Sequence, residues 1–91
     1  MPKTIAVIGA LDTKGPEFAF VKAEIERRGQ RALVINTAVM GEPAFPPDVA
    51  AEDVAEAGGA SLTELRTKAD RGAAMAVMAR GAAAVVRRLF D

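Results

Sequence analysis

Two short apolar runs flank a stretch of helical periodicity in the first half of the chain. Residues 5–8 are continuously apolar, which is typical of a strand covered on both faces in a parallel sheet, so we predict a strand over 3–9. Apolar residues at i, i+3 and i+7 then predict a helix over 16–28, and a second apolar run predicts a strand over 32–35. Strand, helix and strand in this order form a right-handed βαβ unit with parallel strands. The loops that follow the two strands therefore leave the same edge of the sheet.

The rest of the chain is predicted to be helical after one irregular loop. Residues 38–48 contain one glycine and three prolines, which prevent regular structure and stiffen the backbone. A loop of this length is either a binding loop or a plain connection, and its large side chains expected to meet a ligand are Glu42 and Phe45. Three helices follow, over 50–57, 61–68 and 71–90.

Local signals mark where the last two helices begin. Ser61 and Glu64 match a capping box, and Asp70 is a candidate N-cap of the final helix. That helix combines apolar residues at helical spacing with several glycines and alanines. We therefore expect it to pack closely against the sheet or another helix.

These elements predict an α/β fold: an incomplete Rossmann-like three-layer domain, with one βαβ unit of two parallel strands followed by two or three helices. Two strands make a poor sheet, and the apolar last helix should cross over to a third strand. We therefore expect residues 1–91 to be a single partial N-terminal α/β nucleotide-binding-like domain, with the remainder of a longer protein absent after Asp91. Alternatively, the chain covers its free strand edge by self-association. In either case we expect a homo-oligomer rather than a monomer.

Composition narrows the functional classes. The 91 residues include 12 basic and 12 acidic side chains, so no net field attracts nucleic acid or an anionic membrane. The absence of cysteine and histidine excludes disulfides, thiol chemistry, zinc sites and Ser-His-Asp triads within this chain. The segment that begins Met1-Pro2 lacks the apolar core of a signal peptide, and arginines interrupt the alanine-rich stretch that could otherwise span a membrane. We expect a cytoplasmic protein with no nucleic-acid or membrane partner.

The loop from Gly9 to Gly15 joins the first strand to the first helix and is the candidate binding site. A helix points its unpaired N–H groups and the positive end of its dipole at such a loop, where anions bind. Thr13 supplies a hydroxyl and Lys14 an ammonium. Gly9 and Gly15 let a ligand approach the backbone. The loop therefore predicts a phosphate site.

A structural interpretation of the same loop stays open. Thr13 and Lys14 precede Gly15 instead of following it, so the P-loop pattern does not match, and the three-glycine dinucleotide fingerprint is lacking. Gly15 and Pro16 can simply begin the helix, with Asp12 or Thr13 as its cap.

Asn36 ends the second strand, on the same edge as the glycine loop. In dinucleotide-binding βαβ units a residue about 20 positions beyond the glycine loop bonds the ribose, and that residue is usually acidic. Here it is an amide, which can donate to and accept from a hydroxyl. The alternative explanation is a turn-forming asparagine at a strand end.

Three ordered motifs carry a resemblance to a known family. They are Thr-Ile-Ala-Val-Ile-Gly-Ala-Leu-Asp-Thr-Lys-Gly over 4–15, Gly-Glu-Pro-Ala-Phe-Pro-Pro-Asp over 41–48, and Asp-Arg-Gly-Ala-Ala over 70–74 with Met-Ala-Arg-Gly-Ala over 78–82. With these motifs the chain resembles the ATP-binding proteins named after the tomato mosaic virus resistance protein. The resemblance implies a Rossmann-like N-terminal domain that continues into a further strand and a glycine-rich loop, within a far longer protein. It also implies ATP or another nucleotide as the ligand, with or without Mg²⁺.

Carried onto this sequence, the resemblance favours nucleotide contact by the residues of the first motif. The predicted nucleotide-binding residues are then Gly9, Leu11, Asp12, Thr13, Lys14, Gly15 and Asn36. Two departures from the family pattern bear on this set. Asn36 stands where the family often has aspartate, which weakens the ribose contact, and the downstream glycine-rich loop is absent from this chain.

Three hypotheses of function follow. In the first, the chain is the nucleotide-binding N-terminal part of such a protein, without chemistry of its own. In the second, it is an assembly module whose strand edge and alanine-rich helices pair with another copy or with the missing downstream part of the protein. In the third, Asp12 or Glu17 orients water for hydrolysis near a metal-bound phosphate. The sequence holds no catalytic or metal-binding constellation, so enzyme activity is left open.

Overall fold

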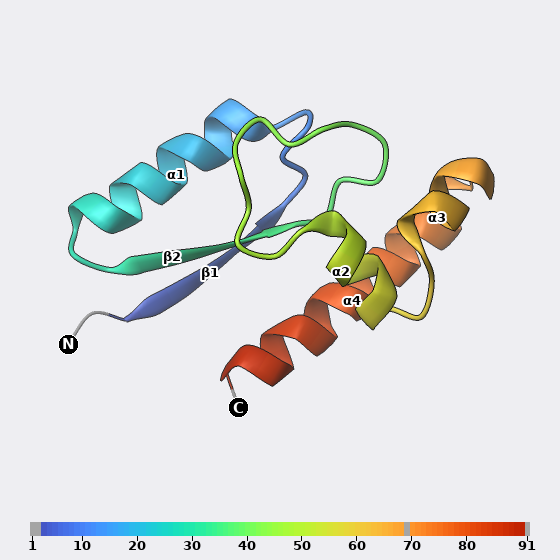
Figure 1. Cartoon of the computed structure of the whole chain (residues 1–91). Helices are drawn as coiled ribbons and strands as arrows, with labels where there is room; N and C mark the ends of the chain where they lie inside the picture. Colours follow the sequence, from blue (N-terminus) through green and yellow to red (C-terminus); the bar gives the residue numbers. More distant parts are fainter. Residues whose placement is uncertain (1–2, 69, 91) are drawn as a thin grey trace.

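Two parallel strands and four helices make up the protein in the computed structural model, which describes residues 3–68 and 70–90. Met1, Pro2, Ala69 and Asp91 lie outside the described residues. The predictions made for the segment that begins Met1-Pro2 and for the end at Asp91 therefore concern residues outside this range. In chain order the elements are β1 (Thr4–Gly9), α1 (Gly15–Arg27), β2 (Arg31–Asn36), α2 (Ala51–Ala57), α3 (Leu62–Lys68) and α4 (Arg71–Phe90). Within the described residues, the predicted α/β architecture of one βαβ unit followed by helices is confirmed (Figure 1).

β1 and β2 pair in parallel, from Thr4 opposite Arg31 to Gly9 opposite Asn36. Both strands therefore end at one edge of the sheet, here called the carboxyl edge, where the loops that follow them meet. The N–H of Thr37 donates to the carbonyl oxygen of Gly9 across this edge, at 2.9 Å.

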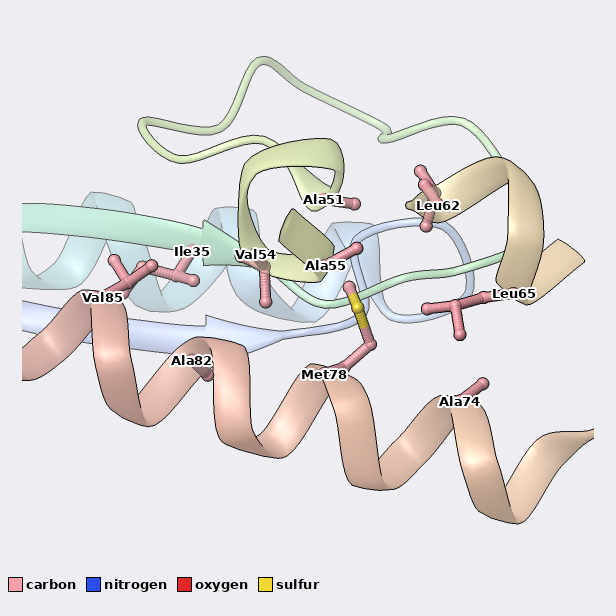
Figure 2. Packing of buried hydrophobic residues seen from close by; sticks show 10 residues of the cluster. All are labelled: Ile35, Ala51, Val54, Ala55, Leu62, Leu65, Ala74, Met78, Ala82 and Val85. Atoms are coloured by element: carbon pink, nitrogen blue, oxygen red, sulfur yellow. The ribbon is translucent and has the colours of Figure 1, made fainter. Parts of the chain in front are cut away.

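Each face of the sheet has its own hydrophobic core. Neighbouring residues of a strand point to opposite faces, so Val34 packs on the α1 side while Ile35 packs with α2 and α4. Val7 and Leu11 join Val34 on the α1 side. The larger cluster on the other side (Figure 2) consists of Ile35, Ala51, Val54, Ala55, Leu62, Leu65, Ala74, Met78, Ala82 and Val85. The predicted three layers, with the sheet between two layers of helices, are confirmed.

α2 and α4 approach each other closely through glycine residues. A Cβ at Gly81 of α4 would overlap the backbone carbonyl of Val54 in α2. A Cβ at Gly58, which follows α2, would overlap the backbone carbonyl of Val77 in α4. Arg80 donates to the carbonyl oxygen of the same Gly58 at 3.3 Å. The close packing predicted for the last helix is confirmed.

The caps predicted for the last two helices are confirmed. The N–H of Glu64 donates to Ser61 Oγ, and Glu64 Oε1 accepts the N–H of Ser61. Asp70 Oδ1 accepts the N–H of Ala73 at 3.1 Å. Each side chain thereby satisfies a backbone donor that the first turn of its helix leaves unpaired.

The cap predicted for α1 is wrong. Lys14 occupies the N-cap position, and no side chain caps this helix. Asp12 and Thr13 lie too early in the chain for that role, and the carboxylate of Asp12 bonds other N–H groups. α1 begins instead with Pro16 in its first turn, a position where the missing N–H is not needed. None of the described helices is long and apolar enough to cross a membrane.

Candidate functional site

A cleft of about 470 Å³ opens at the carboxyl edge of the sheet. Asp12 and Thr13 line it from the loop after β1, and Thr37 and Met40 line it from the loop after β2. Leu65 of α3 and the first turns of α4 complete the lining. The cleft thus lies where the loops of both strands meet the amino end of α4.

The lining combines apolar surface with a few charged groups. Met40 and Met75 are 68% and 70% exposed, and such flexible, polarisable side chains adapt to apolar groups of many shapes. Arg71 brings a cation to the cleft at the amino end of α4, where the helix dipole adds positive potential. The carboxylates of Asp12 and Asp70 also line the cleft, but both accept backbone N–H bonds. The cleft therefore combines apolar surface with one cation, Arg71, that can attract a negatively charged group, and two carboxylates.

Asp12 ties the two loops of the carboxyl edge together. Its Oδ1 accepts the N–H of Thr13 at 2.7 Å, and its Oδ2 accepts the N–H of Gly41, in the loop after β2, at 3.2 Å. A Cβ at Gly41 would lie 2.7 Å from the Cβ of Asp12, so this contact requires glycine. The carboxylate is therefore a structural link as well as part of the cleft wall.

Asn36 forms a second link between the same loops, and it is only 2% exposed. Its Oδ1 accepts the N–H of Leu11 at 3.2 Å and the N–H of Ala38 at 3.0 Å. The bond to Ala38, two residues further on, is the usual pattern of a turn-forming asparagine. These contacts match the alternative explanation given for Asn36, while a ribose contact stays a prediction.

Three other predicted residues pack against protein atoms. A Cβ at Gly9 would overlap the ring of Phe18, and a Cβ at Gly15 would overlap the Cβ of Ala44. The loop after β2 thus contacts Gly15 at the amino end of α1, close to where the phosphate was expected. Leu11 is 0% exposed and belongs to the core on the α1 side.

The structure therefore divides the predicted residues. Asp12 and Thr13 line the cleft, whereas Lys14 is exposed and lies outside the lining. In the loop after β2, Phe45 packs against the core on the α1 side, and Glu42 is exposed away from the lining, so neither is positioned at the cleft as expected.

Sequence reasoning missed Met40, Arg71 and Met75 as lining residues. A signal for the last two exists, because a helix that crosses back over a parallel sheet begins at the carboxyl edge. The start of the helix predicted over 71–90 could have been placed beside the loops on that ground. Among residues 3–68 and 70–90, no group of three or more acidic side chains lies close enough to hold a metal ion.

The chain is similar over nearly its whole length to proteins of one family. The model of the N-terminal domain of UPF0261, described as an uncharacterised protein family, matches residues 3–91. A UPF0261 protein of Clostridium tetani is 47% identical over 89 residues, which cover 98% of this chain and 22% of that protein. UPF0261 proteins of Brucella suis and Brucella melitensis are each 41% identical over 85 residues, 93% of this chain and 20% of theirs. The chain thus spans about a fifth of the length of these curated relatives, and no solved structure matches it.

These matches correct three expectations from the sequence. The matching family is UPF0261 and not the ATP-binding family named after the tomato mosaic virus resistance protein, so the predicted resemblance is wrong. The family description gives no support for ATP binding. The matches also do not show the chain to be a fragment, so that expectation is withdrawn as well.

Proposed function

This chain belongs to the UPF0261 family, matched across its N-terminal domain, and from the geometry of its cleft we propose that the domain binds a small phosphate-bearing ligand of the nucleotide class. One observation carries the proposal. The cleft lies at the carboxyl ends of two parallel strands and is lined by the loops that follow both. Open α/β sheets bind their ligands outside the carboxyl ends of the strands.

The phosphate is assigned to the amino end of α4. At the amino end of α1, Gly15 packs against Ala44, and Lys14 lies outside the lining of the cleft. α4, by contrast, presents Arg71 and its first turn to the cleft, and the loop after β1 adds Thr13. The Arg71 guanidinium and the helix dipole attract an anion, whereas the carboxylates of Asp70, which caps the same helix, and Asp12 oppose it. We therefore place the phosphate near Arg71, with the Thr13 hydroxyl as a further donor.

The apolar part of the ligand is assigned to the methionine-lined surface. Met40 and Met75 are largely exposed, and Leu65 also lines the cleft. A volume of about 470 Å³ lies within the range of roughly 300–1,000 Å³ that small-molecule sites occupy. A nucleobase and its sugar are of that size. A cytoplasmic location forms part of the same proposal, because nucleotides are abundant in the cytoplasm.

Titration calorimetry tests this function with adenosine, AMP, ADP and ATP, each nucleotide with and without Mg²⁺. We expect the phosphorylated compounds to bind more tightly than adenosine. Arg71→Ala should weaken their binding about tenfold or more, because one charge-assisted contact contributes on the order of 1.5–3 kcal/mol. Arg87→Ala is the matched control, since Arg87 is exposed near the other end of the same helix.

Two results would contradict the proposal. One is a folded sample that binds none of these compounds at millimolar concentration. The other is an equal effect of Arg71→Ala and Arg87→Ala, which would mean that only the net charge of the domain matters.

A further inference from the structure

Residues 48–49 close the outer edge of β2 at its carboxyl end. The N–H of Val34 donates to the Asp48 carboxylate at 2.7 Å, and the carbonyl of Val34 accepts the N–H groups of Asp48 and Val49. The N–H of Asn36 donates to the carbonyl of Val49 at 3.0 Å. The outward-facing peptide groups at this end of β2 are thus paired within the domain.

The outer edge of β1 has no such cover. The carbonyls of Lys3 and Gly9 accept N–H bonds from the β2 side, and peptide groups alternate in direction along a strand. The N–H and carbonyl groups of Thr4, Ala6 and Ile8 therefore point away from β2. Within residues 3–68 and 70–90, no hydrogen bond reaches these outward groups.

The open edge is suited to pairing. β1 contains six residues without a charge or a proline, and Ile5 and Ile8 are 41% and 44% exposed. Proteins that leave a strand edge free usually protect it with charges, prolines or bulges. Here that protection is lacking on β1, while the domain's own residues pair the carboxyl end of the β2 edge.

We propose that the outer edge of β1 is the position of one further parallel strand. In the longer relatives, the segment that follows this domain supplies that strand. The topology of the fold selects this position. α1 and α4 cover opposite faces of the sheet, and right-handed crossovers on opposite faces run in opposite directions across a sheet. The crossover from β1 to β2 runs through α1 on one face of the sheet. A crossover from β2 through α4, on the opposite face, runs in the opposite direction, so the strand that follows α4 lies beside β1.

Two further observations agree with this occupant. Figure 1 shows α4 running back from the carboxyl edge toward the amino ends of the strands, which is where a parallel strand starts. The matched region is an N-terminal domain and covers only 22% of the Clostridium tetani relative, so that protein has further chain to supply the strand.

Hydrogen–deuterium exchange at single residues tests the pairing. In this chain alone, the amides of Thr4, Ala6 and Ile8 should exchange quickly, while the outward amides of Val34 and Asn36 in β2 are protected. In the full-length Clostridium tetani relative, the amides aligned with Thr4, Ala6 and Ile8 should exchange about 100-fold more slowly, because they join a stable sheet. Equal exchange in the two proteins would overturn the proposal. So would protection in this chain together with a concentration-dependent dimer in ultracentrifugation, since a second copy would then occupy the edge.

A proline substitution gives an independent test. Ala6→Pro removes an outward N–H and spares the bonds between β1 and β2, whereas Val7→Pro removes an inward one. In this chain, Ala6→Pro should therefore lower the melting temperature less than Val7→Pro. In the full-length relative, proline at the position aligned with Ala6 should be about as damaging as proline at the next position. If proline at the position aligned with Ala6 still lowered the melting temperature of the relative less than proline at the next position, the outer edge of β1 would be unpaired and the proposal wrong.

Discussion

Asn36 shows how much of the carboxyl edge depends on single side chains. Its buried Oδ1 is shared between the N–H groups of Leu11 and Ala38. Each buried donor left without an acceptor costs on the order of 1–3 kcal/mol. One amide therefore stabilises both loops that line the cleft.

Replacing Asn36 tests this role. Asn36→Ala should lower the free energy of unfolding by about 2–4 kcal/mol, because two buried N–H groups lose their acceptor. Urea denaturation monitored by circular dichroism measures the change. Asn36→Asp is the control, since it keeps an oxygen at the same place and should retain most of the stability. Equal losses in the two variants would show that the acceptor oxygen is not what matters.

The contact between Gly15 and Ala44 allows a paired test at the same scale. Gly15→Ala places a methyl group on the Cβ of Ala44, and overpacking of this kind costs about 1–3 kcal/mol. Ala44→Gly removes the opposing methyl, so the double variant should recover most of the loss measured by thermal unfolding. A double variant no more stable than Gly15→Ala would mean that Ala44 does not pack against Gly15.

The sequence predicts which residues stand at the carboxyl edge, because strand ends follow from local apolar patterns. It does not predict what those residues contact. Gly9 meets Phe18, and Asp12 bonds Gly41. Each partner lies in a different element or loop, so its position depends on the path of the folded chain.

At the scale of elements, the contact between α2 and α4 holds the helical layer together. Gly81 lets α4 approach the backbone of Val54, and Gly58 lets the end of α2 approach Val77. Around this contact lie Met78 and Val85, two members of the larger core (Figure 2). The helices are therefore positioned by backbone contact as well as by side-chain burial.

Replacing each of two glycines of α4 by alanine distinguishes the effect of close packing from the effect of helix propensity on stability. Gly81→Ala should destabilise by about 2–3 kcal/mol, because the new methyl meets backbone atoms that cannot move aside easily. Gly72→Ala meets only Asp70 Oδ1 at 3.6 Å, and alanine favours helix by up to about 1 kcal/mol over glycine. That control should be neutral or stabilising in thermal unfolding. Similar losses in both variants would contradict the close approach of the helices.

Element bounds follow closely from the sequence. The strand predicted over 32–35 extends over Arg31–Asn36, and the helix predicted over 16–28 extends over Gly15–Arg27. The differences of one residue arise at ends, where local signals compete. The cap of α1 was predicted wrongly because Asp12 bonds Gly41 in a distant loop, a contact that local pattern does not contain.

At the scale of the whole molecule, the handedness and pairing rules for parallel strands were enough to predict the layers. They were not enough to predict the cleft, which four separate segments line once they have folded together. Arg71 and Met40 come from segments whose sequence predicts only a helix start and a stiff loop. Family assignment also needed direct comparison, since short motifs alone led to the wrong family.

The links through Asp12 and Asn36 also bear on how a ligand would enter the cleft. Both loops are fixed to each other by hydrogen bonds within the protein. A mobile loop loses on the order of 1–2 kcal/mol of entropy per residue when it becomes ordered, and here that loss accompanies folding rather than binding. In the complex that we propose, the ligand would therefore meet loops that need no closing step, and diffusion and orientation would limit its association.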